Sequence, residues 1–289
     1  MNKAIGNWKK TAVNKKMPRV IQAALFYSQL LARDLGLFGA HLNYCRFIIL
    51  GRGRSGSNFL RSLLNSHSQI LVFGELFRFY DSIGWEFPDY DQCLQHRRVL
   101  SLIQQDPGRF LQEQVFRNGP KGISAVGFKI FYYHAQEDCR KAVWPYLKGQ
   151  RDLKVIHLKR NNTLRMFLSE IKAFQTNRWT NINGEKEESD PVSLNYEDCL
   201  GRFILAEEEK KQFDAYFSNH QKIDVYYENL ADDYEREMKR VQQFLGVNHE
   251  IVRPSTYKQS NQALSQAIAN YFELKERFKG TRWEEFFED

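Results

Sequence analysis

A buried strand that runs through a glycine-rich loop into a helix constrains this fold more than any other feature. The apolar run Cys45–Leu50 leads into the loop Gly51–Asn58, which reads GRGRSGSN, and the helical pattern Asn58–Asn65 follows at once. Backbone N–H groups of such a loop and the positive end of the helix dipole point at one place. Glycines let the backbone approach an anion closely because they carry no Cβ atom. The segment therefore predicts an anion-binding loop.

Short apolar runs alternate with helical patterns along the chain. The predicted strands are Cys45–Leu50, Ile70–Phe73, Ala125–Ile130, Lys154–Leu158 and Ile223–Tyr227. The predicted helices are Pro18–Asp34, Asn58–Asn65, Cys93–Gln104, Gly108–Phe116, Asn162–Arg178, Leu194–Asn219, Ala231–Leu245 and Asn261–Phe278. Two irregular stretches, Phe77–Tyr90 and Thr180–Pro191, interrupt them. Strands alternating with helices predict an α/β fold, a P-loop-like parallel sheet of about five strands with helices on both faces.

Charge and cysteine usage narrow the class of protein. The 289 residues carry a formal net charge of +7, which suits polyanions, an anionic membrane face or a charged nucleotide without selecting one. The four cysteines are scattered, which argues against a disulfide framework or zinc site and favours a reducing compartment. We therefore predict a cytoplasmic protein that needs no metal.

The N-terminal region predicts an extension to the main domain. Residues 1–44 combine several lysines with the amphipathic pattern Pro18–Asp34, and residues 45–289 are expected to form a single domain. No run reaches the roughly 18 apolar residues of a membrane span, and a cleavable signal peptide is not expected. The helix either packs on the domain or makes a peripheral contact with an anionic membrane at its inner face. A homodimer remains an open alternative.

The loop differs from that of nucleotide-hydrolysing proteins. Their motif GxxxxGK[ST] places a lysine where this chain has Ser57, after Gly51 and Gly56. That lysine serves the β- and γ-phosphates, and the following hydroxyl holds Mg²⁺. Its absence argues against a kinase. The loop offers Arg54 just before Ser55 instead.

At these residues the chain resembles the sulfotransferases that use 3′-phosphoadenosine 5′-phosphosulfate (PAPS). Their first signature is a strand, then [K/R]-S-G-[S/T]-[S/T], then a helix. Within this superfamily the chain most resembles the bacterial carbohydrate enzymes of the trehalose and nodulation-factor type, which have an arginine at the position of Arg54. Asn58 departs from the usual Thr, although its amide can still bond a phosphate oxygen. The resemblance implies the sulfotransferase fold, and PAPS contacts from Gly53, Arg54, Ser55, Gly56, Ser57 and Asn58.

A second segment adds to the resemblance. A strand ending at Leu158 is followed by Arg160, and Ser169 lies about two turns into the next helix. An arginine fork and a serine hydroxyl can converge on one phosphate, and the family binds the 3′-phosphate of PAPS with such a pair. Ala173, Thr176 and Trp179 fit the Ala-x-x-Thr-x-x-Trp continuation of the bacterial group. In the family a loop near the C-terminus covers the nucleotide, and Lys258 is the matching candidate.

Sulfuryl transfer requires a cation for the leaving oxygen and a base for the acceptor hydroxyl. Arg54 is the predicted cation, and Lys129 is a second one that needs an anionic partner inside its strand. Glu75 is the favoured base, because it follows the second strand, matches the proposed catalytic Glu of trehalose-type enzymes, and has an apolar setting that would raise its pKa. His134, past the third strand, is the rival base.

The sequence constrains the acceptor less than it constrains the donor. Glu75, Arg78, Trp85 and Trp179 are the candidate contacts, because aromatic faces and arginine forks suit sugars. The resemblance implies transfer from PAPS to a hydroxyl of a carbohydrate or glycolipid by in-line displacement, leaving adenosine 3′,5′-bisphosphate. Two alternatives stay open: a P-loop kinase or inactive relative, and a basic polyanion-binding protein, although no nucleic-acid motif is present.

Overall fold

The computed structural model describes residues 18–136, 138–184, 190–257 and 262–288. The predicted basic stretch before Pro18, the central part of the acidic loop Thr180–Pro191, and Lys258 lie outside these described residues.

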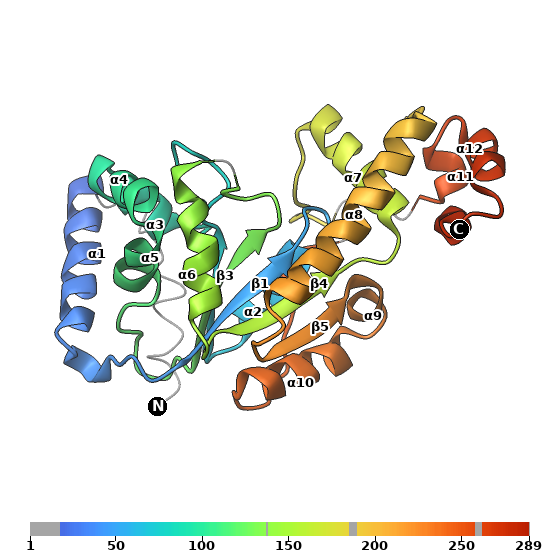
Figure 1. The fold of residues 1–289 in the computed structure, drawn as a ribbon. Coiled ribbons are helices and arrows are strands. Elements are labelled where there is room, and N and C mark those ends of the chain that lie inside the picture. Colours follow the sequence, from blue (N-terminus) through green and yellow to red (C-terminus); the bar gives the residue numbers. More distant parts are fainter. Residues whose placement is uncertain (1–17, 137, 185–189, 258–261, 289) are drawn as a thin grey trace.

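One parallel five-stranded sheet organises the molecule (Figure 1), in the order β2-β3-β1-β4-β5. Its strands are β1 (Cys45–Gly51), β2 (Ile70–Glu75), β3 (Ala125–Phe131), β4 (Lys154–Lys159) and β5 (Lys222–Tyr226). All neighbouring pairs run parallel. The sequence prediction of a parallel α/β sheet is confirmed, and each predicted strand agrees with the structure to within one or two residues at either end.

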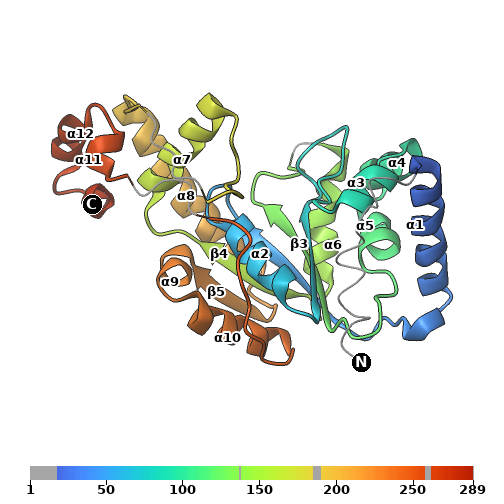
Figure 2. The ribbon, with the colours of Figure 1, turned by 180° about the vertical axis from the view of Figure 1, so that it is seen from behind.

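Side chains of the central strand alternate between two cores. Ile48 and Leu50 point into the larger core, which α1 and α3 to α6 (residues 19–34 and 88–149) and the C-terminal part of α8 (Tyr196–Tyr216) cover. Phe47 and Ile49 point to the opposite face, against α2 (Ser57–Ser66) and α10 (Tyr234–Leu245). Figure 2 shows α2 and α10 from behind the sheet. Both faces are therefore covered, as the uninterrupted apolar strands require.

The remaining helices fill the connections between strands. They are α1 (Arg19–Asp34), α3 (Pro88–Cys93), α4 (Arg97–Gln105), α5 (Pro107–Phe110), α6 (Val143–Gly149), α7 (Thr163–Thr176), α9 (Tyr227–Asp232), α11 (Leu264–Ala267) and α12 (Tyr271–Phe278), with the short turns η1 (Leu37–Gly39), η2 (Leu111–Val115), η3 (Cys139–Ala142) and η4 (Glu284–Phe287). Side-chain caps mark several starts: Asn162 accepts from Arg165 N–H at α7, and Asn195 accepts from Glu197 N–H at α8.

Four predicted helices differ from the structure. The pattern Gly108–Phe116 forms α5 followed by η2, and the pattern Ala231–Leu245 begins inside α9 and continues after Asp233 as α10. The pattern Asn261–Phe278 forms α11 and α12 instead of one helix, because Ala267 C=O and Ala269 N–H bond the backbone of Val192. Those two bonds use groups that a continuous helix would pair internally. The pattern Cys93–Gln104 also fails as one helix, since Cys93 ends α3 and α4 starts at Arg97. The sequence prediction missed α6, and it also has no helix over most of α3 and α9.

Helix α1 is amphipathic, as predicted. Phe26 and Leu30 are buried in the larger core, and Tyr27 Oη donates to Cys93 C=O on α3. Val20 and Leu31 are exposed on its other side, and Leu35, just after the helix, is exposed as well. No helix in the described part of the chain is long and apolar enough to cross a membrane. Contact with a membrane surface, and the division at residue 44, stay predictions.

Candidate active site

A cavity of about 990 Å³ lies at the carboxyl ends of the strands. Each of the five strands contributes a lining residue at or just after its end: Gly53 after β1, Glu75 on β2, Phe131 on β3, Arg160 after β4 and Tyr227 after β5. This is the edge where open parallel sheets place their ligands. The volume is at the upper end of the range for small-molecule sites, so it can hold two substrates together.

The predicted anion-binding loop forms one wall of this cavity. Gly56 has φ +91°, and a Cβ atom there would lie 2.3 Å from the Tyr227 ring, so glycine is required. Ser57, the first residue of α2, lines the cavity beside it. The first N–H groups of α2 have no partner within the helix and are available to an anion. Ser55 departs from its predicted role, because its buried hydroxyl donates to Arg52 C=O and does not line the cavity.

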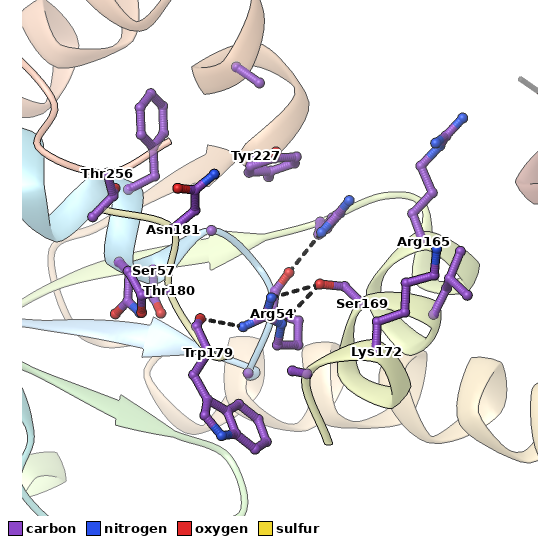
Figure 3. Close-up of a pocket in the computed structure, with 18 of the residues that line it drawn as sticks. Arg54, Ser57, Arg165, Ser169, Lys172, Trp179, Thr180, Asn181, Tyr227 and Thr256 are labelled. Atoms are coloured by element: carbon purple, nitrogen blue, oxygen red, sulfur yellow. Dashed lines mark hydrogen bonds between the residues drawn. The ribbon is translucent and has the colours of Figure 1, made fainter. Parts of the chain in front are cut away.

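The Arg54 guanidinium crosses the loop to α7. Its Nε and Nη2 lie 3.0 and 2.8 Å from Ser169 Oγ, and its Nη1 donates to Trp179 C=O at 2.7 Å. Figure 3 shows these bonds at the centre of the cavity. Ser169 was predicted to pair with Arg160 on a phosphate, and both line the cavity, but in the structure Ser169 accepts from Arg54. The two predicted segments, more than a hundred residues apart, thus meet directly.

Arg160 combines a fixed position with spare hydrogen-bonding capacity. Its Nη1 donates to Arg54 C=O at 2.9 Å, and its guanidinium carbon lies 4.4 Å from the centre of the Tyr227 ring. Its Nε is buried and has no hydrogen-bond partner among the described residues. A buried N–H without a partner is costly. The Arg160 guanidinium also lines the cavity, so a bound anion there can accept hydrogen bonds from it.

Cations outnumber carboxylates along the cavity wall next to α7. Arg54, Arg160, Arg165 and Lys172 all line it. Burial, and then the neighbouring Arg160, lower the pKa of Arg54. Burial likewise lowers the pKa of Arg160 and of Lys172. Each shift means that the surroundings disfavour the positively charged form of that side chain. A multiply charged anion would relieve that cost, so the site fits a phosphorylated ligand.

Glu75 lies at the edge of the cavity, among cations. Its carboxylate is 3.5 Å from Arg78 Nη1 and 3.4 Å from Lys129 Nζ. The sequence analysis expected an apolar setting from the neighbouring phenylalanine and leucine side chains, and this expectation was wrong, because Leu76 and Phe77 turn into the core. A β-bulge between Phe73 and Glu75 shifts the strand end and places the carboxylate beside Lys129.

His134 is buried next to Glu75 and does not line the cavity. Its Nδ1 accepts the backbone N–H of Phe131 at 3.2 Å, so the neutral ring carries its proton on Nε2. That Nε2 lies 3.9 Å from Glu75 Oε2. Burial, then Arg78 and Lys129, lower the pKa of His134 to about 3. The ring is therefore neutral near pH 7, and the nitrogen that faces Glu75 has no free lone pair to accept a proton.

Lys129 has the anionic partners that its buried position requires. The side chain is fully buried on β3, and its Nζ lies 2.9 Å from Glu86 Oε1 and also donates to Asn58 Oδ1. It does not line the cavity, so its predicted contact with sulfuryl oxygens is replaced by a contact with the carboxylate of Glu75. The predicted phosphate ligand Asn58 is likewise engaged, because its Nδ2 donates to Thr180 Oγ1 at 2.7 Å.

The acceptor candidates separate into two groups. Arg78 and Trp179 line the cavity, and the Arg78 guanidinium lies 5.1 Å from the Trp179 ring. Trp85, in contrast, is completely buried and packs against Phe73 and Tyr90. It therefore belongs to the core and cannot reach an acceptor. Lys258 lies outside the described residues.

Three residues that shape this site are not among the candidates predicted from the sequence. Tyr227 stacks on Arg160, and its position directly after β5 was a usable signal. Tyr133 is 51% exposed and lines the cavity, with its hydroxyl 2.6 Å from the place of a Cβ on Gly53. Glu86 binds Lys129 from within an irregular stretch, where no pattern could indicate it.

A cluster of ligand-type side chains outside the cavity is paired with a lysine ammonium. His157, Asp214 and Asp224 lie close enough to share one cation. Lys159 Nζ, however, lies 2.8 Å from a carboxylate oxygen of each aspartate. The lysine ammonium thus supplies the positive charge to this cluster.

Comparison with known proteins identifies the class. A model of the sulfotransferase family matches residues 147–250, which include β4, Arg160 and α7. Nodulation protein H of Rhizobium tropici is 30% identical over 248 residues, covering 84% of this chain and 92% of that protein. Nodulation protein H of Rhizobium meliloti is 29% identical over 253 residues, covering 84% and 94%.

The chain belongs to the sulfotransferase family, and it is an enzyme of that family. Membership implies PAPS as the sulfuryl donor. The crystal structure of a sulfotransferase from Alicyclobacillus acidocaldarius matches this structure with a TM-score of 0.45 and a sequence identity of 17%. The match covers 80% of this chain and 88% of that one.

Proposed function

We propose that this enzyme transfers the sulfuryl group of PAPS to a hydroxyl of a carbohydrate or glycolipid acceptor. One observation carries the proposal: the loop before α2 and Arg160 after β4 line the same cavity, with Glu75 at its edge. Two anion-binding features on one cavity suit a donor with phosphate groups at both ends of its ribose. The similarity to Nodulation protein H, and the resemblance to bacterial carbohydrate enzymes, support a sugar-containing acceptor.

The residues of the cavity fit the donor. Ser57 and the first N–H groups of α2 would hold the 5′ end, and the Arg160 guanidinium would hold the 3′-phosphate. Bound PAPS supplies an activated sulfuryl group whose transfer leaves adenosine 3′,5′-bisphosphate. Arg54, held by Ser169 and Trp179, supplies positive charge between the two anchors.

Glu75 is the proposed base. Its carboxylate can accept the proton of an acceptor hydroxyl, while Arg78 and Lys129 keep it oriented. His134 packs beside Glu75, with its Nε2 3.9 Å from Glu75 Oε2. It offers no free lone pair to the cavity, because its Nδ1 already accepts the backbone N–H of Phe131. We therefore assign proton transfer to Glu75 and a positioning role to His134 and Lys129.

A transfer assay tests this proposal directly. The purified chain would be given PAPS labelled with radioactive sulfur and a panel of acceptors: sugars, glycolipids and phenols. We expect label on the sugar-containing acceptors. Label found only on phenols would contradict the acceptor class, and adenosine 3′,5′-bisphosphate that fails to bind would contradict the donor site.

A further inference from the structure

Exposed aromatic side chains gather beside the Glu75 end of the cavity. Phe79 is 45% exposed and Phe174 is 68% exposed. Between them lie Arg78 and Trp179, which line the cavity. Figure 3 shows the Trp179 ring on the opposite side of Arg54 from Tyr227, so it faces away from the proposed nucleotide anchors. Surface aromatics grouped in this way mark a binding surface.

The four side chains Phe79, Arg78, Trp179 and Phe174, here called the aromatic platform, form a continuous series. The Arg78 guanidinium lies 4.7 Å from the Phe79 ring centre and 5.1 Å from the Trp179 ring centre. The Trp179 and Phe174 rings are 4.9 Å apart and nearly perpendicular. Arg78 and Trp179 line the cavity, whereas Phe79 and Phe174 do not, so the series leads from the cavity lining to the exposed surface beside it.

The aromatic platform is joined to the proposed base. Arg78 Nη1 lies 3.5 Å from Glu75 Oε2, so one guanidinium contacts two aromatic rings and the carboxylate. Trp179 is fixed from its other end, since its C=O accepts from Arg54 Nη1. A ligand that rests on this surface is therefore held in a defined position relative to Glu75.

The chemistry of the aromatic platform favours sugar rings over an acyl chain. The C–H face of a pyranose packs on an aromatic ring, and its hydroxyls bond a guanidinium fork. An acyl chain would have to cover the Arg78 charge without offering it a hydrogen bond, which is costly. We infer that the aromatic platform binds the sugar ring next to the sulfated one, so that the enzyme favours acceptors of two or more rings. This inference rests on the proposed function and specifies its acceptor subsite.

Acceptor length provides the first test. Turnover would be measured with N-acetylglucosamine and its oligomers of two and four rings. We expect kcat/KM to rise roughly tenfold from one ring to two, which corresponds to about 1.4 kcal/mol of added binding. Equal efficiency for all lengths would overturn the inference and leave the proposed function intact. A chain that sulfates phenols but none of these sugars would overturn both.

Variants of the aromatic platform provide the second test. Phe174→Ala should raise KM for the longer oligomers about fivefold with little change in kcat, because it removes binding that is uniform along the reaction. It should leave the one-ring acceptor and the affinity for adenosine 3′,5′-bisphosphate unchanged. Phe272→Ala is the matched control, since Phe272 is also exposed but lies on α12. Equal losses in both variants, or an equal loss with the one-ring acceptor, would overturn the inference.

Discussion

Glu75 and His134 show how two neighbouring side chains can have different capacities for proton transfer. Both were candidates for the base, and they lie 3.9 Å apart. Only Glu75 borders the cavity, and the bond from Phe131 N–H to Nδ1 decides which nitrogen of His134 carries the proton. The difference comes from hydrogen bonding and burial, which residue type alone does not determine.

We expect Glu75→Gln to bind adenosine 3′,5′-bisphosphate normally but to lose transfer by roughly 10²–10⁴-fold, the usual contribution of a general base. His134→Asn should keep most of the transfer, because the Asn carbonyl oxygen can accept the Phe131 N–H as Nδ1 does. Radiolabel transfer and calorimetric nucleotide binding measure the two properties. The assignment is wrong if the two variants exchange these outcomes.

Arg160 is predicted to contribute mainly to donor affinity. Arg160→Ala removes a charge-assisted bond worth about 1.5–3 kcal/mol, so bisphosphate binding should weaken roughly 10- to 100-fold. Arg282→Ala is the control, since that arginine is 59% exposed in its side chain and does not line the cavity. Titration calorimetry would compare the affinities of the two variants for adenosine 3′,5′-bisphosphate. An Arg160→Ala protein that binds this nucleotide as tightly as wild type would refute the role of Arg160 in donor binding.

At the scale of elements, the ends of strands carry most of the chemistry. Strand β3 places Lys129 in the interior, where Glu86 and Glu75 neutralise it from two directions. Burial alone would raise the pKa of Glu86, but Lys129 and Arg61 outweigh it and lower the pKa. A carboxyl with a depressed pKa stabilises the folded state above its unfolded pKa, about 4.3, and this contribution is lost as the pH falls.

Glu86→Gln should therefore destabilise the protein at pH 7 by about 1–3 kcal/mol, because it leaves Lys129 short of one partner. The deficit relative to wild type should shrink between about pH 5 and pH 3, as the carboxylate of the wild type becomes protonated. Urea unfolding across that pH range gives the measurement. Glu113→Gln, in the exposed pair with Arg109, should change stability by no more than about 0.5 kcal/mol. A deficit that stays constant with pH would contradict the ionic role.

Some boundaries of helices and strands can be predicted from the local sequence pattern, and others cannot. Strands such as Cys45–Gly51 were predictable, since a strand buried on both faces reads as one apolar run. The break between α11 and α12 was not, because Ala267 and Ala269 bond Val192, a residue about 75 positions away. A helical periodicity in the sequence does not reveal that a backbone group from another part of the chain will bond to these residues.

For the whole molecule, ligand binding should appear as a change in global stability. A ligand of the folded state at a hundred times its dissociation constant adds about 2.7 kcal/mol to the free energy of unfolding. We expect adenosine 3′,5′-bisphosphate to raise Tm by this mechanism and ATP to raise it much less, since Ser57 replaces the lysine that serves a γ-phosphate. Thermal denaturation in the presence of each nucleotide measures these shifts in Tm.

Equal stabilisation by ATP with Mg²⁺ would favour the kinase alternative. Stabilisation by any polyanion, lost steeply with added salt, would favour the polyanion-binding alternative.

The sequence by itself determined the five strands, the loop GRGRSGSN, and the placement of Arg160 after a strand and of Ser169 on the next helix, because these depend on residue type and short-range spacing. Only the tertiary structure decided which groups meet: Ser169 with Arg54, Lys129 with Glu86, and Trp85 in the core rather than at the site. Contacts of that kind join segments that are far apart along the chain. Their partners are set by the order of strands in the sheet and by burial, which local pattern does not encode.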